Sequence, residues 1–251
     1  MTQSDLTDAY AAHTERIRGE VIAWEKKILK KPTLWERSTG AVQKGVEKLI
    51  PEKIHSVITS AIKQMTRTVV YGSQFAVPRG DLEASPVKME VKVRKRIRYY
   101  RYAAATEGAV TGAGGFWLSL ADFPIWLSLK MKLLHDIAGL YGYDVLDYRE
   151  RIFLLYIFQM TFSNPTERAA TFDKIRNWET YRETIPDDIN DFDWRTFQLE
   201  YRNYIDLAKL AQMIPGVGAV AGFLVNQSLT YKLGRNAMNA YRFRRFPGLQ
   251  R

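Results

Sequence analysis

Two long apolar stretches limit the possible folds of this chain more than any other sequence feature does. Residues 108–129 contain a single charged side chain, Asp122, and residues 210–231 contain none. Both reach the roughly 20 residues that a helix needs to cross a bilayer. Prolines and glycines interrupt both stretches, however, and Asp122 would cost roughly 2.5–3.5 kcal/mol in the middle of an inserted helix. We therefore expect two glycine-bent helical hairpins that form the core or dip into a membrane surface, rather than two full membrane spans.

Small residues, prolines and one amide define how these hairpins bend and pack. Glycines four residues apart leave a smooth helix face that a neighbouring backbone can approach closely. Asp122 precedes Pro124 by two residues, which is typical of a helix N-cap. The expected packing set is Gly108, Gly112, Gly114, Gly115, Pro124, Pro215, Gly216, Gly218, Gly222 and Asn226.

The rest of the chain shows helical periodicity and no run of β-alternation long enough to build a sheet. Apolar residues recur at three- and four-residue spacing in residues 7–30. Asp144 or Asp147 can cap a helix over 148–162, and Asn164 with Pro165 marks the start of another. Further helices are predicted over 34–49, 52–70 and 220–242. Another is predicted to follow the basic segment 88–101 and to end in the glycine cluster, and a long helix is expected after "DFDWR", with one face lined by residues from Phe197 to Ala211. The sequence therefore predicts an all-α, single multi-helix domain over residues 1–251, with residues 1–20 and 243–251 peripheral.

Composition restricts the compartment and the partner. The chain has no cysteine, which excludes disulfides and thiolate metal sites, and no metal-ligand or nucleotide-binding motif is present. The glycines at 112–115 follow no strand and precede no Lys-Ser/Thr pair, so no cofactor is expected. The first twenty residues lack the apolar core of a signal peptide, which favours the cytoplasm. A formal net charge of +10 and a pI near 9.6 favour an anionic partner.

Basic residues interleaved with aromatic ones are the main surface signal. They occur between residues 88 and 102 and again in the tail "YRFRRFPGLQR". Such patterns suit an anionic membrane surface, and they also suit single-stranded RNA, although no RNA-binding motif supports that second interpretation. A merely solvated face is the alternative to both. The residues predicted to bind an anionic surface are Lys92, Arg94, Lys95, Arg96, Arg98, Arg101, Arg242, Arg244 and Arg245.

Enzymatic chemistry has weaker support in the sequence. Carboxylates in an apolar pocket can be driven to different pKa values and perform acid–base catalysis. Glu107, Asp122 and His135 could form such a pocket in a hydrolase, but their spacing fixes no geometry and no nucleophile motif accompanies them. A helix cap for Asp122 and a buried, hydrogen-bonded His135 are the structural alternatives.

Several segments together resemble the EcsC protein family of bacteria. The resemblance covers residues 24–245 and is most specific in "TGAGGFWLSLADFP", "LYGYD", "IPGVGAVAGFLVNQ" and "AMNAYRFR". It implies a bacterial helical protein, cytoplasmic or peripheral at the inner face of the cell membrane, with a link to an ABC transporter or to secretion. A membrane-transporter subunit therefore joins the anionic membrane surface as an expected partner, and nucleic acid is disfavoured. The resemblance supplies no catalytic residues.

Overall fold

The computed structural model describes residues 3–30, 52–71, 76–78, 85–111, 123–204 and 219–246. This part of the chain folds into nine α-helices and one short 3-10 helix, with no β-strand. The predicted all-α class is therefore confirmed. The helix expected over 34–49, Asp122 and most glycines of the two apolar stretches lie outside the described residues.

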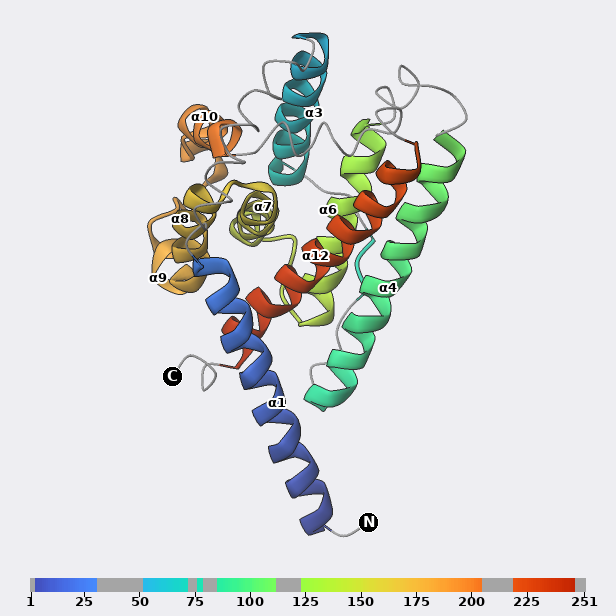
Figure 1. Cartoon of the computed structure of the whole chain (residues 1–251). Helices are drawn as coiled ribbons and strands as arrows, with labels where there is room; N and C mark the ends of the chain where they lie inside the picture. Colours follow the sequence, from blue (N-terminus) through green and yellow to red (C-terminus); the bar gives the residue numbers. More distant parts are fainter. Residues whose placement is uncertain are drawn as a thin grey trace.

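Three long helices lie side by side and form one half of the molecule (Figure 1). They are α4 (Pro86–Thr111), α6 (Phe123–Leu140) and α12 (Ala219–Arg245). Helix α12 approaches α4 closely at Gly234, where an added Cβ would lie 2.8 Å from Cγ1 and 2.9 Å from Cγ2 of Ile97. Glycine is needed at this crossing because any side chain would displace Ile97 or separate the helices.

The described parts of the two apolar stretches contact each other, while the glycine-rich bends predicted for the hairpins lie outside the described residues. Asn226 on α12 is buried, and its Oδ1 accepts a 2.7 Å hydrogen bond from Nε1 of Trp126 on α6. Its Nδ2 donates to the carbonyl oxygen of Ala104 on α4 at 3.1 Å. One amide therefore satisfies polar groups on two neighbouring helices in an apolar interior. Gly108 lies in the last turn of α4, Pro124 in the first turn of α6 and Gly222 in the first turn of α12.

Helix α7 (Tyr148–Phe162) forms the centre of the other half (Figure 1). Every one of its side chains is buried except that of Arg149, as the apolar sequence predicts. Asp147 caps it by accepting a hydrogen bond from the amide of Arg149 at 2.9 Å, and Asn164 caps the next helix through the amide of Glu167 at 3.2 Å. Both predicted caps are confirmed.

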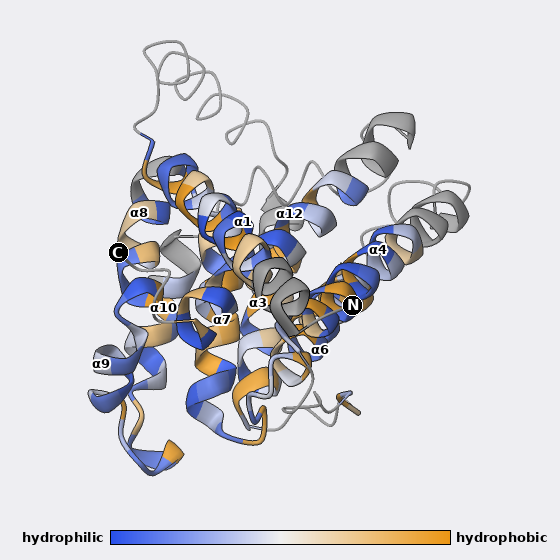
Figure 2. Ribbon diagram, turned by 90° about the horizontal axis from the view of Figure 1, so that it is seen from below, coloured by the Kyte–Doolittle hydropathy of each residue, from blue (hydrophilic) through white to orange (hydrophobic). Residues whose placement is uncertain are grey.

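Other helices lie around α7. They are α3 (Glu52–Tyr71), α8 (Pro165–Arg176), α9 (Trp178–Glu183), the 3-10 helix η2 (Ile189–Asp191) and α10 (Trp194–Tyr204). Phe197 and Tyr201 of α10 are buried, as their spacing predicts. Seen from below, apolar residues gather where the helices face one another and polar residues lie outside (Figure 2).

The first helix, α1 (Gln3–Leu29), packs against α8 and α12. Its predicted apolar face is confirmed, because Ile17, Val21, Trp24 and Ile28 are all buried. The expectation that residues 1–20 and 243–251 are peripheral is wrong for Ile17 and for Phe243, which is 2% exposed. Phe243 belongs to the core because it packs beside Trp24, with ring centroids 5.9 Å apart.

A tight turn after α6 directs the chain toward α7. The amide of Tyr143 donates to the carbonyl of Ala138, and that of Gly142 donates to the carbonyl of Gly139, both at 3.0 Å. This pair of bonds is the Schellman motif, which requires a left-handed residue after the helix. Gly142 supplies it with a φ of 84°.

Among the described residues, no helix has the length and apolar character needed to span a membrane.

Candidate functional site

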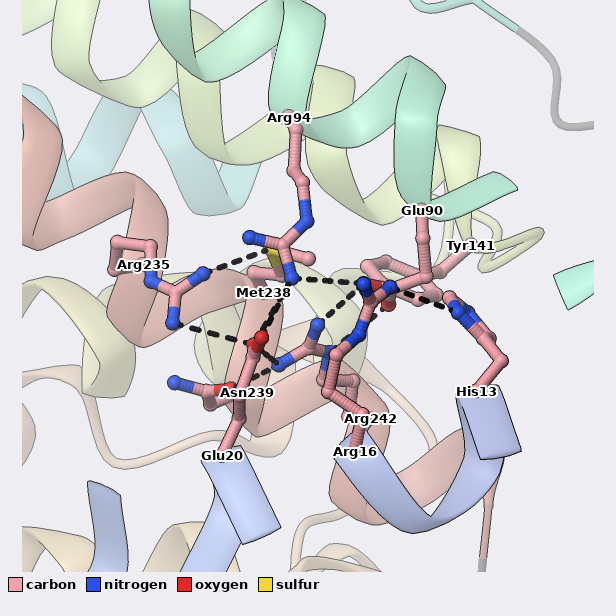
Figure 3. A network of polar contacts seen from close by, with 10 residues as sticks. All are labelled: His13, Arg16, Glu20, Glu90, Arg94, Tyr141, Arg235, Met238, Asn239 and Arg242. Atoms are coloured by element: carbon pink, nitrogen blue, oxygen red, sulfur yellow. Dashed lines mark hydrogen bonds and ion pairs between the residues drawn. The ribbon is translucent and has the colours of Figure 1, made fainter. Parts of the chain in front are cut away.

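A cluster of charged side chains joins α1, α4 and α12 (Figure 3). Arg242 on α12 is fully buried and makes a two-pronged contact with Glu90 on α4, which is 1% exposed. Arg242 Nε donates to Glu90 Oε1 at 2.9 Å, and its Nη2 contacts Oε2. Tyr141 donates to the same carboxylate at 2.6 Å. A buried carboxylate is stable only when it is paired in this way.

Glu20 on α1 forms the second centre of the cluster. Its carboxylate accepts from Arg242 Nη1 at 2.8 Å, from Arg94 Nη2 at 2.9 and 3.1 Å, and from Arg235 Nη2 at 3.3 Å. Burial would raise the pKa of Glu20, but the hydrogen bonds and charges of Arg242 and Arg94 outweigh it and lower the pKa to about 2. Glu20 is therefore ionised at neutral pH.

The cluster carries an excess of positive charge. Three guanidinium groups, those of Arg94, Arg235 and Arg242, meet two carboxylates, those of Glu20 and Glu90. His13 lies nearby, and its Nδ1 accepts a 2.9 Å hydrogen bond from Arg16 Nη2. Burial, and then the charge of Arg16, lower the pKa of His13, so it adds no charge at neutral pH.

A surface groove opens beside this cluster, between α4 and α12. It has a volume of about 320 Å³ and is lined by Arg94, Ile97, Arg98, Tyr231 and Arg235, which we call the arginine groove. Arg94 and Arg98 lie one turn apart on α4, and Tyr231 and Arg235 lie one turn apart on α12. Ile97 separates the two walls where it meets Gly234. The groove lining contains three cations and no acid.

The outward face of α4 carries a second basic feature. From Lys88 onward, its exposed residues recur at three- and four-residue spacing, so they lie on one side of the helix. We call this the α4 stripe; it consists of Lys88, Val91, Lys92, Lys95, Arg98, Tyr99 and Tyr102.

Ion pairing divides the predicted basic residues of α4 into two groups. Arg94 pairs with Glu20, and Arg96 lies 3.4 Å from the buried carboxylate of Asp136. Lys92, Lys95 and Arg98 are exposed and make no ion pair with another described residue. Arg101 is half-buried, with its guanidinium 5.5 Å from the centre of the Tyr231 ring.

The three arginines predicted in the tail differ in burial. Arg242 is in the cluster, and the side chain of Arg244 is only 4% exposed. Arg244 donates to both oxygens of the buried Glu150 at 2.9 and 2.8 Å, and its guanidinium lies 4.1 Å from the centre of the Tyr143 ring. Both arginines face inward, so the prediction that they bind an external surface is wrong. Arg245 is exposed.

Of the predicted catalytic residues, the structure describes the side chain of His135 alone. It is fully buried, and its Nδ1 donates to the carbonyl oxygen of Met131 at 2.7 Å, the hydrogen bond that the non-catalytic interpretation expects. Burial lowers the pKa of His135 to about 4. The side chain of Glu107 and the whole of Asp122 lie outside the described residues. Convergence of the three therefore stays a prediction.

Asp136, next to His135, belongs to another buried contact group. It accepts a 2.9 Å hydrogen bond from Tyr100 and contacts Lys132 and Arg96. The described residues contain no group of three or more side chains suited to hold a metal ion.

Sequence reasoning missed the acidic partners Glu20, Glu90 and Glu150. Local spacing could have identified Arg242 as inward-facing, because it follows the buried Met238 by four residues on the same helix face. No local signal could pair it with Glu90, which is 152 residues away.

Comparison with known proteins gives a consistent result. Residues 15–246 match the family described as the EcsC protein family. The chain is 42% identical to "Protein EcsC" of Bacillus subtilis (strain 168) over 226 residues, which covers 90% of this chain and 93% of that protein. It is 27% identical to "Uncharacterized protein YdbA" of the same organism, over 90% of each chain. No solved structure matches it significantly.

Proposed function

The chain belongs to the EcsC protein family, and we propose that it is a peripheral protein that binds an anionic membrane surface through the α4 stripe. The observation that carries the proposal is the one-sided arrangement of exposed charge on α4. The four cations Lys88, Lys92, Lys95 and Arg98 point outward. The one acid among residues 88–101, Glu90, points inward and is neutralised by Arg242.

Aromatic side chains on the same face support a membrane over a purely solvated surface. Tyr99 is 61% exposed, Tyr102 is 64% exposed and Val91 is 46% exposed. A tyrosine ring is apolar along its body and polar at its hydroxyl, which suits the headgroup region of a bilayer. Exposed apolar and aromatic residues between lysines are costly in water and favourable at that boundary.

Electrostatics would provide most of the attraction. Each lysine or arginine close to an anionic leaflet contributes about 1 kcal/mol, and the attraction decays within a Debye length. Replacing Lys88, Lys92 and Lys95 by glutamine should therefore weaken binding to anionic vesicles by about 100-fold.

Co-sedimentation with vesicles is the test. The triple variant K88Q/K92Q/K95Q should lose binding to vesicles that contain phosphatidylglycerol, and neither protein should bind pure phosphatidylcholine. The matched control is K26Q/K27Q/K30Q, which removes three exposed lysines at the end of α1. Equal losses in the two variants would show that only net charge matters and would overturn the role of the stripe.

Salt and RNA separate this proposal from its alternatives. High salt should release the protein from bacterial membranes, whereas retention in high salt would indicate insertion of apolar segments. Tight binding of single-stranded RNA with no binding to anionic vesicles would replace the membrane by nucleic acid as the partner. The link to a membrane-transporter subunit stays a prediction, tested by co-purification after cross-linking in membranes.

A further inference from the structure

We propose that the arginine groove is a binding site for a phosphate monoester, and that the source is the headgroup of a phospholipid such as phosphatidic acid. This inference rests on the proposed function for the source of the phosphate, but the groove itself is argued from its own contacts. It differs from the α4 stripe because the stripe is a convex face, whereas the groove is a concave site between two helices.

The groove presents guanidinium groups that are already held in place. Arg94 and Arg235 reach it from opposite walls, and each is fixed from behind by the carboxylate of Glu20 (Figure 3). A guanidinium group has five N–H donors in a rigid plane. The contacts to Glu20 use Nη2 of each arginine, and Nη1 of Arg235 also contacts Sδ of Met238 at 4.0 Å. Among the described residues, Nε and Nη1 of Arg94 make no hydrogen bond, so they can donate to a ligand without rearrangement of the side chain. Such preorganisation lowers the entropy lost on binding.

Charge indicates an anion with more than one negative charge. The cluster behind the groove carries one positive charge in excess, and Arg98 adds a second at the rim. A phosphate monoester carries about −1.5 to −2 at pH 7 and has three terminal oxygens. A phosphodiester headgroup carries one negative charge on two oxygens, so it would leave part of the groove uncompensated.

The aromatic end of the groove suits a ligand with an organic substituent. Tyr231 is 43% exposed, and the Arg101 guanidinium stacks over its ring. The buried Nε of Arg101 has no hydrogen-bond acceptor among the described residues. Tyr231 supplies apolar surface beside the cations, so the groove fits an esterified phosphate better than a free inorganic ion.

The groove lies next to the proposed membrane face. Arg98 belongs to both features, since it lies at the edge of the α4 stripe and at the rim of the groove. A protein resting on the stripe would therefore bring the groove close to the headgroup layer. The stripe would then attract the protein to the anionic membrane over a long range, and the adjacent groove would select the phosphate monoester headgroup at short range.

The first experiment compares two lipids at equal surface charge. Phosphatidylcholine vesicles are mixed with either phosphatidic acid or phosphatidylglycerol, and the two sets are matched for zeta potential. Wild-type protein should bind the phosphatidic acid vesicles at least about tenfold more tightly, as one additional hydrogen bond between charged groups would give. Equal binding to the two sets would overturn the inference and leave the proposed function standing.

The variants assign any preference to the groove. R98Q and R235Q should each abolish the preference, and R98Q is the safer variant because Arg98 is exposed and the fold does not depend on it. R67Q, which removes an exposed arginine on α3, is the matched control and should keep the preference. A preference that survives both R98Q and R235Q would overturn the inference.

A soluble ligand tests the groove independently of membranes. Glycerol 3-phosphate should raise the melting temperature of the wild-type protein and of R67Q, but not that of R98Q. If the protein binds no anionic vesicle, the proposed function fails, but the glycerol 3-phosphate experiment still tests whether the groove binds phosphate. An increase in melting temperature that R98Q abolishes would then support a free phosphate monoester as the ligand. Absence of stabilisation together with absence of a lipid preference overturns the site altogether.

Discussion

The pairing of Arg242 with Glu90 leads to the sharpest prediction on stability. Arg242 has no exposed surface and Glu90 has 1%, so replacing Arg242 by methionine leaves a buried carboxylate without its cation. Breaking a buried pair in this way costs about 3–5 kcal/mol. Since a domain of this size unfolds with a total of about 5–15 kcal/mol, R242M should lose a large part of its stability.

A double-mutant cycle measures the pairwise contribution. E90Q, R242M and E90Q/R242M are unfolded in urea at pH 7, and the free energies of unfolding are compared. The double variant should be more stable than the sum of the single losses predicts, because removing both partners leaves no unpaired buried charge. The coupling should be about 0.5–3 kcal/mol, the range for contacting residues.

Two outcomes would refute this reasoning. One is a loss below about 1 kcal/mol for R242M, which is the size of a surface ion pair and would mean that the pair is solvated. The other is strict additivity in the cycle. Arg67→Met is a suitable control, since Arg67 is exposed on α3 and its replacement should change stability by less than about 1 kcal/mol.

Three further predictions concern single residues. Gly139→Ala should destabilise the protein by about 1–3 kcal/mol, because its Cβ would lie 2.3 Å from Cγ1 of Val77 and an overpacked side chain forces backbone shifts. Gly19→Ala is the matched comparison: its Cβ would meet nothing within 4 Å, so it should stabilise α1 by up to about 1 kcal/mol. Thermal unfolding measures both changes. Burial lowers the folded-state pKa of His135 from 6.5 to about 4, so the contribution of His135 to stability should be complete above pH 6.5 and should be lost as the pH falls toward 4. In His135→Asn this pH-dependent loss of stability should be smaller by up to about 3 kcal/mol. Identical stability–pH profiles for the two proteins would contradict the assignment. The pKa of Glu20 is lowered to about 2 in the folded state, so the stabilisation by Glu20 is complete above about pH 4.5 and is lost as the pH falls toward 2. Across this pH range, the melting temperature should fall less steeply for Glu20→Gln than for the wild-type protein. Equal slopes would show that the arginines do not hold Glu20.

Periodic and capping signals predicted the local structure well. The apolar face of α1, the buried α7 and the caps at Asp147 and Asn164 all follow from spacings within a single helix. Asn226 was expected to take part in hairpin packing, and its two hydrogen bonds place it between α4 and α6. The helix faces and the caps share a cause, because each of these signals depends on residues only a few positions apart. The partners of Asn226, by contrast, lie 100 and 122 positions away.

The charged cluster could not be predicted for the same physical reason. The basic tail resembles an exposed polybasic segment, and the sequence does not indicate that Glu20 and Glu90 will be folded against it. The spacing from Met238 indicates that Arg242 faces inward, but only the packing of α1, α4 and α12 brings the distant acids against it. The inward turn of Arg244 onto Glu150 is a second case of the same kind.

The contacts of α1 with α12 also bear on how the chain reaches its folded state. Glu20 meets Arg242 across 222 positions, and Trp24 Nε1 donates to Asn236 across 212 positions. During synthesis, α1 and the inward face of α4 are made long before the helix that neutralises Glu20 and Glu90. Because closing such a long loop is slow, these contacts form late. Until they form, the N-terminal segments expose apolar and charged surfaces to solvent. The last helix therefore completes the domain, and a nascent chain that ends before Ala219 should be bound by chaperones or degraded rather than folded.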